Sequence, residues 1–110
     1  EEQKLLDRAN LFGEKFQGRF GKLTDRFPEI GDIRSLGAMC AIEFFDDNDQ
    51  PNGQIVREIL AKAHQRGLIL MSAGLYGNVI RLLAPLVITD DQIEEGFEVL
   101  ESAIAECCQR

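Results

Sequence analysis

The fold of this chain is decided by residues 68–83, which read LILMSAGLYGNVIRLL. Two apolar runs, at 68–71 and 79–83, predict two short buried strands. Gly74 and Gly77 lie between the runs and indicate a loop, since glycine accepts the positive φ that such loops often need. A strand, a short loop and a second strand together predict an antiparallel pair.

A second pair of strands is expected between residues 31 and 45. Residues 39–45 read MCAIEFF, and this nearly continuous apolar run suits a strand that is covered on both faces. Gly37 interrupts the segment and indicates a bend or a bulge. The polar residues 46–53 that follow predict a surface loop.

The chain begins with a segment that predicts an amphipathic helix over residues 1–27, ended by Pro28. Gly13, Gly18 and Gly21 should each weaken this helix by up to about 1 kcal/mol relative to alanine. Such a helix needs a surface to pack on. Its apolar stripe consists of Leu5, Ala9, Phe12, Phe16, Phe20, Leu23 and Phe27.

Two further helices follow from the same kind of apolar stripe. One precedes Gly67, which is placed as its C-terminal stop. The other begins at Thr89, because Thr89 and Gln92 form a capping-box pattern. The stripes are Ile55, Val56, Ile59, Leu60 and Ala63 in the first of these helices, and Ile93, Phe97, Leu100, Ile104 and Cys107 in the second.

The order of elements is therefore a helix, two strands, a helix, two strands and a helix. This order predicts a single α+β domain over residues 1–110, with the N-terminal helix at 1–27 and the sheet part at 31–110. We expect a small, mostly antiparallel sheet of about four strands, with helices packed on it.

Composition excludes several classes of function. The 110 residues carry a net charge of −7, which disfavours a nucleic-acid partner. No apolar run approaches the roughly 18 residues that span a membrane. The three cysteines form no even framework, which favours a reducing cytoplasm. His64 is the only histidine and has no metal-ligand spacing around it, so no metal site is expected.

Arg81 is the most informative residue for function. On a strand it shares one face with Val79 and Leu83, while Ile80 lies on the other face. An arginine among apolar neighbours must either reach outward to water or meet an anion, and its planar guanidinium suits a carboxylate. Two interpretations stay open from the spacing alone: a substrate-binding residue, or an internal ion pair with Glu43 on a neighbouring strand.

Residues 66–86, RGLILMSAGLYGNVIRLLAPL, closely resemble the C-terminal domain of class III aminotransferases, and within that class the 4-aminobutyrate aminotransferases. Residues 33–44 resemble the strand-pair motif R-G-x-G-x-M-x-A-x-E-F of the same family, with Ser35 where glycine is usual. The resemblance covers essentially the whole chain. Its most specific part is the block 78–81 with the following Pro85 and Leu86.

The resemblance implies that the chain is the small C-terminal domain of a larger fold-type I enzyme that depends on pyridoxal 5'-phosphate (PLP). The cofactor and its lysine would belong to a large domain, so the 110 residues alone are expected to bind no PLP and to catalyse nothing. The parent is expected to be a homo-oligomer. It would move an amino group from an ω-amino acid such as 4-aminobutyrate to 2-oxoglutarate.

The same resemblance implies a role for Arg81. It matches the family's arginine that binds the α-carboxylate of the amino acid or 2-oxo acid. When the ω-amino acid is bound instead, that arginine is thought to pair with a glutamate of the large domain. Two alternatives remain: another class III transaminase, for acetylornithine, ornithine or diaminobutyrate, and a free-standing regulatory module in which Arg81 is an allosteric anion site.

Overall fold

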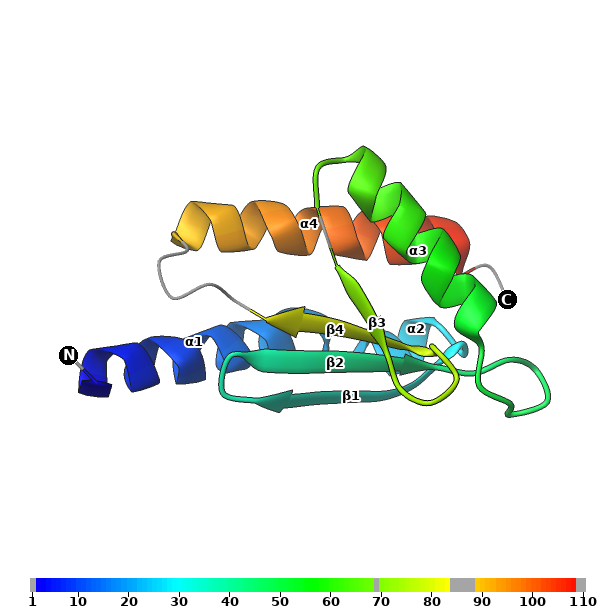
Figure 1. Ribbon diagram of the computed structural model, residues 1–110, viewed down its shortest axis with the longest axis horizontal. Helices are drawn as coiled ribbons and strands as arrows, with labels where there is room; N and C mark the ends of the chain where they lie inside the picture. Colours follow the sequence, from blue (N-terminus) through cyan, green and yellow to red (C-terminus); the bar gives the residue numbers. More distant parts are fainter. Residues whose placement is uncertain (1, 69, 84–88, 109–110) are drawn as a thin grey trace.

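The computed structural model describes residues 2–68, 70–83 and 89–108, and in them places one four-stranded antiparallel sheet with strand order β1-β2-β4-β3. The predicted α+β class and antiparallel sheet are confirmed (Figure 1). The strands are β1 (Ile30–Leu36), β2 (Met39–Phe44), β3 (Met71–Ala73) and β4 (Val79–Leu83). The helices are α1 (Glu2–Phe20), α2 (Leu23–Arg26), α3 (Gly53–Gln65) and α4 (Asp90–Cys107).

One face of the sheet is buried beneath the helices. Along β2, Cys40, Ile42 and Phe44 are fully buried, and Ile80 and Leu82 of β4 point to the same side. These five side chains join residues of α1, α3 and α4 in one hydrophobic cluster. Figure 1 shows α4 running alongside the sheet, with α3 lying across the C-terminal half of α4. The residues that alternate with these five along the two strands, such as Ala41 and Arg81, lie on the opposite, open face.

An aromatic cluster joins the first helix to the last. Phe12, Phe16 and Phe20 recur at four-residue spacing along α1 and are buried. Their rings surround Phe97 of α4, with centroids 5.5, 6.2 and 5.2 Å away respectively. Tilted and edge-on rings at such distances attract one another beyond the burial of their area. The apolar stripe of the N-terminal segment is therefore buried against α4 and the sheet.

The prediction of an uninterrupted helix over residues 1–27 is wrong. The helix α1 ends at Phe20, and a separate short helix, α2, follows from Leu23. The break falls at Gly21, where an added Cβ would lie only 2.5 Å from the carbonyl oxygen of Gln17. The interruption lets Leu23 turn into the same core as Phe20.

The strand predicted from the apolar run at residues 68–71 begins only at the end of that run. The observed strand β3 covers Met71–Ala73. Leu68 and Leu70 are partly buried against the core without being part of a strand, and Ile69 lies outside the described residues. Their burial accounts for the apolar run. Pro85, expected to close β4, also lies outside the described part of the chain.

Several local signals were predicted correctly. Thr89 accepts a hydrogen bond from the Gln92 backbone, and the Gln92 side chain accepts one from the Thr89 backbone, which completes the capping box of α4. Gly67 follows α3 with a φ of +87°. Gly37 has a φ of +59° and lies in the turn between β1 and β2, whereas the irregularity of the ladder falls between Ile30 and Asp32.

Candidate functional site

Arg81 extends from the open face of the sheet. It lies on β4, between Ala41 of β2 on one side and Met71 of β3 on the other. The side chain is exposed, and no described residue forms an ion pair or a hydrogen bond with it. The guanidinium keeps all its donors available, and a carboxylate could be bound in the two-pronged manner that arginine favours.

The open face holds a groove of about 390 Å³ around this arginine. Its walls combine two arginines, Arg34 and Arg81, with the apolar side chains of Met39, Ala41 and Val79. A cation within apolar walls suits a small organic acid, because the guanidinium holds the carboxylate and the walls contact its methylene groups. The groove can therefore bind and orient such a molecule, although it contains no pair of groups arranged for proton transfer or nucleophilic attack.

The two arginines of the groove differ in their partners. Nη1 of Arg34 donates hydrogen bonds to Asp32 and, at 3.4 Å, to Glu43. The hydrogen bond to Asp32 is the main reason why the pKa of Arg34 is raised. Glu43 was the alternative partner proposed for Arg81 from the sequence, and the structure pairs Glu43 with Arg34 instead. Arg34 therefore has its charge compensated internally, whereas Arg81 does not.

The loop before β4 fixes the position of Arg81 along the strand. Gly74 and Gly77 have φ values of +85° and +65°, so the two glycines are needed for the loop conformation. Asn78 is buried, and its side chain donates a hydrogen bond to the Phe44 carbonyl, 3.1 Å away. Sequence reasoning did not predict this role for Asn78. The available signal was a polar residue directly before an apolar strand.

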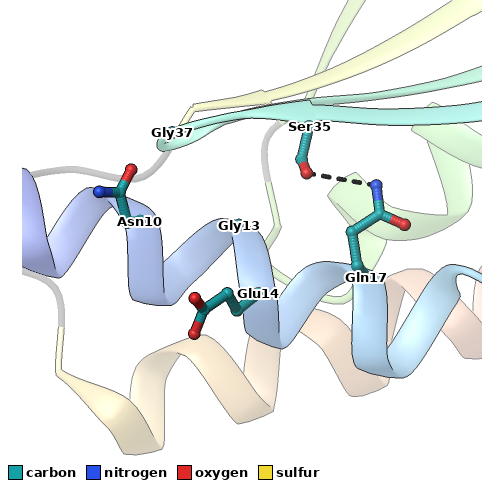
Figure 2. Close-up of a pocket in the computed structure, with 6 residues that line it drawn as sticks. All are labelled: Asn10, Gly13, Glu14, Gln17, Ser35 and Gly37. Atoms are coloured by element: carbon teal, nitrogen blue, oxygen red, sulfur yellow. Dashed lines mark hydrogen bonds between the residues drawn. The ribbon is translucent and has the colours of Figure 1, made fainter.

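A second groove, of about 470 Å³, lies between α1 and the turn from β1 to β2 (Figure 2). Gln17 donates a hydrogen bond from Nε2 to Oγ of Ser35, 3.2 Å away. Ser35 is the residue that departs from the usual glycine of the family motif, and here it links the helix to the strand. The groove contains one ionisable side chain, Glu14, and its one lining hydroxyl, that of Ser35, is engaged by Gln17 with no histidine or lysine in the lining to activate it. We assign it no chemistry.

The cysteines are not placed for catalysis. Burial raises the pKa of the Cys40 thiol to about 12, so it stays protonated and unreactive at neutral pH. Burial likewise raises the pKa of Cys107. His64 is exposed near the end of α3. Within the described ranges, no three His, Cys, Asp or Glu side chains come together as a metal site, and no helix is long and apolar enough to cross a membrane.

PLP is held in its enzymes through a lysine, so a groove that binds it needs a lysine in its lining. None of the grooves described here, nor the one between Glu29 and the loop at 46–52, is lined by a lysine. Lys15 instead contacts Asp90 of α4, with its nitrogen 3.4 Å from the carboxylate. The residues present therefore do not fit the cofactor by themselves, and no step through PLP is derived from this chain.

Comparison with known families identifies the family of this chain. The profile of the family described as aminotransferase class-III matches residues 1–104. The chain belongs to the class III aminotransferases. This match confirms, at the level of the family, the resemblance inferred from residues 33–44 and 66–86. Members of this family use PLP.

Similar proteins in this class III family cover several activities. A 4-aminobutyrate aminotransferase of Escherichia coli is 44% identical over 99% of this chain and 26% of its own length. A 5-aminovalerate aminotransferase of Pseudomonas putida is 42% identical over 96% of this chain and 25% of its own. An alanine/serine racemase of Pyrococcus horikoshii is 40% identical over 94% of this chain and 22% of its own length. The chain thus spans about a quarter of the length of these relatives.

Solved structures agree with this assignment. A transaminase from the marine bacterium Virgibacillus superposes with a TM-score of 0.81 at 26% identity, over 98% of this chain and 26% of that one. A phospholyase from Arthrobacter, solved with phosphoethanolamine, gives a TM-score of 0.85 at 21% identity, over 94% of this chain and 25% of that one. The second likeness concerns the fold alone. The same small α+β fold occurs in both structures.

Proposed function

We propose that this chain is the substrate-anchoring part of an aminotransferase that moves an amino group from an ω-amino acid, such as 4-aminobutyrate, to 2-oxoglutarate. Arg81 binds the α-carboxylate of 2-oxoglutarate or glutamate. The single observation that carries this proposal is the Arg81 guanidinium, exposed on the open face and without an ion-pair partner among the described residues.

The position of Arg81 supports this role. It lies on a strand that is paired on both sides, so its backbone is held by hydrogen bonds from β2 and β3. Because the strand is rigid, Arg81 can hold the carboxylate of a substrate in one orientation. A bound substrate needs this before its other end can react. The apolar neighbours Met39 and Ala41 suit the methylene groups of a five-carbon 2-oxo acid.

The remainder of the parent would complete the site. The chain spans only about a quarter of its relatives, and its open face exposes Leu36, Met39 and Met71, which are 77%, 40% and 50% exposed. Apolar side chains left on one face mark a surface that packs against another part of a protein. We infer that the large domain of the parent covers this face. When bound there, PLP supplies the chemistry of amino-group transfer.

The donor is proposed from the similar proteins. Two of them are named for 4-aminobutyrate and 5-aminovalerate, which are both linear ω-amino acids. Arg81 contacts the acceptor, so this chain alone does not distinguish these donors from acetylornithine, ornithine or diaminobutyrate. The family match over residues 1–104 favours a transaminase over a free-standing regulatory module. We also propose a reducing cytoplasmic location, supported by Cys40, Cys107 and Cys108, which form no disulfide with one another.

Substituting Arg81→Lys in the complete enzyme tests the proposal. Lysine keeps the charge but loses the fork that grips both carboxylate oxygens. Loss of one partner of a desolvated charged pair costs about 2–5 kcal/mol, which corresponds to a loss of roughly one to three orders of magnitude in the 2-oxoglutarate half-reaction. Single-turnover rates, followed through the absorbance of the cofactor, measure each half-reaction separately.

The ω-amine half-reaction provides the internal control. Its carboxylate is expected to be held by the large domain, so its rate should fall much less. A second control is Arg57→Lys, because Arg57 lies on α3 and does not line the groove around Arg81. Equal losses in both half-reactions, together with a lower melting temperature, would mean that Arg81 is a structural residue and would overturn the proposal.

A further inference from the structure

Glu43 lies between two arginines on the open face of the sheet. The register aligns Ala41 of β2 with Arg34 of β1 on one side and with Arg81 of β4 on the other. Glu43 follows Ala41 by two residues, so it shares their face and is a diagonal neighbour of both arginines. Diagonal neighbours across antiparallel strands are roughly 7–8 Å apart, which long side chains can span. Either arginine is therefore within reach of the same carboxylate.

The structure pairs Glu43 with only one of the two. Its Oε1 lies 3.4 Å from Nη1 of Arg34, and the same nitrogen donates to Asp32, which lies opposite Glu43 in the ladder. Arg81 forms no ion pair with Glu43 or any other described residue. The two acids and Arg34 form a charge cluster that uses Glu43 without involving Arg81. We call Asp32, Arg34 and Glu43 the β1–β2 charge cluster.

A carboxylate as close as Glu43 would compete with substrate for Arg81. It is part of the same chain, so its effective concentration near Arg81 is high and no translational freedom is lost when the pair forms. Glu43 is only 28% exposed, which makes an internal partner more favourable for it than for a fully hydrated acid. Something must hold Glu43 if Arg81 is to stay available.

We propose that Arg34 is a positioning residue that holds Glu43 away from Arg81 and so keeps Arg81 available for the substrate carboxylate. This inference rests on the proposed function, because it assumes that Arg81 binds the 2-oxo acid. Arg34 lines the same groove, and its proposed role is exerted through Glu43, which the addition of Glu43→Gln separates from direct contact with the substrate. Asp32 binds the same nitrogen of Arg34 from the side of β1 and limits the orientations open to its side chain.

The test is a double-mutant cycle in the complete PLP-loaded enzyme, with 2-oxoglutarate as the varied substrate. Arg34→Gln frees Glu43 to pair with Arg81, and the KM for 2-oxoglutarate should rise by about threefold to tenfold, the scale of a partly exposed charged pair. The KM for the ω-amine and the kcat should stay within about twofold. Adding Glu43→Gln removes the competitor, and the KM should return to within about twofold of the starting value.

A matched control is Arg66→Gln, which removes another arginine that pairs with a glutamate, Glu106, but on the helical side of the molecule. It should leave the KM for 2-oxoglutarate unchanged. If Arg34→Gln is too unstable to purify, Arg34→Lys gives the same test with a rise at the lower end of that range, about threefold, because a single ammonium replaces the fork.

Each outcome bears on the proposal. A raised KM that Glu43→Gln restores supports it. A raised KM that Glu43→Gln fails to restore means that Arg34 binds the substrate itself or stabilises the fold, and overturns it. An unchanged KM in Arg34→Gln or Arg34→Lys overturns it as well. Arg81→Lys, measured alongside, separates the two hypotheses: if that variant spares the 2-oxoglutarate half-reaction, the proposed function has failed, and not only the role of Arg34.

Discussion

The two faces of the sheet use residues that alternate along the same strands, yet they differ in how far they are covered and in the charge that they carry. On the covered face Ile42 and Ile80 are fully buried within the hydrophobic cluster shared with the helices. On the open face Arg81 is exposed without an ion-pair partner among the described residues, Met39 and Met71 face outward, and Arg34 contacts Asp32 and Glu43. The comparison teaches that a buried, stabilising side chain and an exposed one, proposed here for substrate binding, can be neighbours in sequence, because successive residues of a strand point to opposite faces.

The largest expected effect on stability comes from the covered face. Ile42→Ala removes a fully buried side chain and leaves a cavity, so unfolding free energy should fall by about 2–5 kcal/mol. Met39→Ala, three residues away on the open face, should change it by no more than about 0.5 kcal/mol. Urea denaturation of the purified variants measures both values. Similar losses for the two would contradict the division of the sheet into a stabilising and a recognising face.

A smaller effect on stability is expected where α1 approaches the turn between β1 and β2. A Cβ added at Gly13 of α1 would lie 2.6 Å from the carbonyl oxygen of Gly37, in the turn from β1 to β2. Gly13→Ala should therefore destabilise the fold by about 1–3 kcal/mol, because neither backbone can yield easily.

Gly18→Ala in the same helix is the matched control. An added Cβ there would meet nothing within 4 Å, so alanine should stabilise the helix by up to about 1 kcal/mol through its better helix propensity. Thermal unfolding of the two variants would show shifts of opposite sign. A stabilised Gly13→Ala variant would mean that α1 does not approach the turn this closely.

The smallest effect tests whether charges help to hold the helices over the covered face. Asp90 at the start of α4 accepts a hydrogen bond from Arg8, 2.9 Å away, and this bond is the main reason why the pKa of Asp90 is lowered. A carboxyl group whose folded pKa lies below its unfolded value of about 3.8 stabilises the fold above that value, and loses this effect as the pH falls through the folded pKa.

The measurement is the melting temperature of the original chain and of Asp90→Asn between pH 7 and pH 3. The original chain should melt slightly higher at pH 6–7, and the difference should begin to shrink near pH 4 and keep falling towards pH 3. The effect is small because Asp90 is well exposed and water screens the pair. A difference that grows towards low pH would contradict this sign.

Sequence patterns predicted those parts of the fold that depend on neighbours in the chain. The capping box of Thr89 and Gln92 was predicted because both partners lie within one helical turn. The strand at 79–83 and the glycines of its preceding loop were equally readable. By contrast, the apolar run at 68–71 was predicted as a strand, and burial against the core rather than sheet pairing explains most of it.

The candidate site shows the same division. The sequence singled out Arg81 because a guanidinium on an apolar strand is unusual, but it left open whether Glu43 was its partner. Only the register between β1, β2 and β4 decided that Glu43 contacts Arg34 instead. No spacing along the chain could have decided this, since Glu43 has an arginine within reach on either side.

Gly13 and Arg81 together mark what the sequence determined and what the tertiary structure added. The sequence by itself determined the family, the order of the elements other than α2, and the face on which Arg81 lies, because periodicity and motifs are properties of adjacent residues. Only the tertiary structure decided that Gly13 is a point of close contact with Gly37 and not merely a weak place in a helix, and that Arg34, not Arg81, pairs with Glu43. Both depend on contacts between segments distant in sequence, and the distances across those contacts are fixed when the helices and strands pack together.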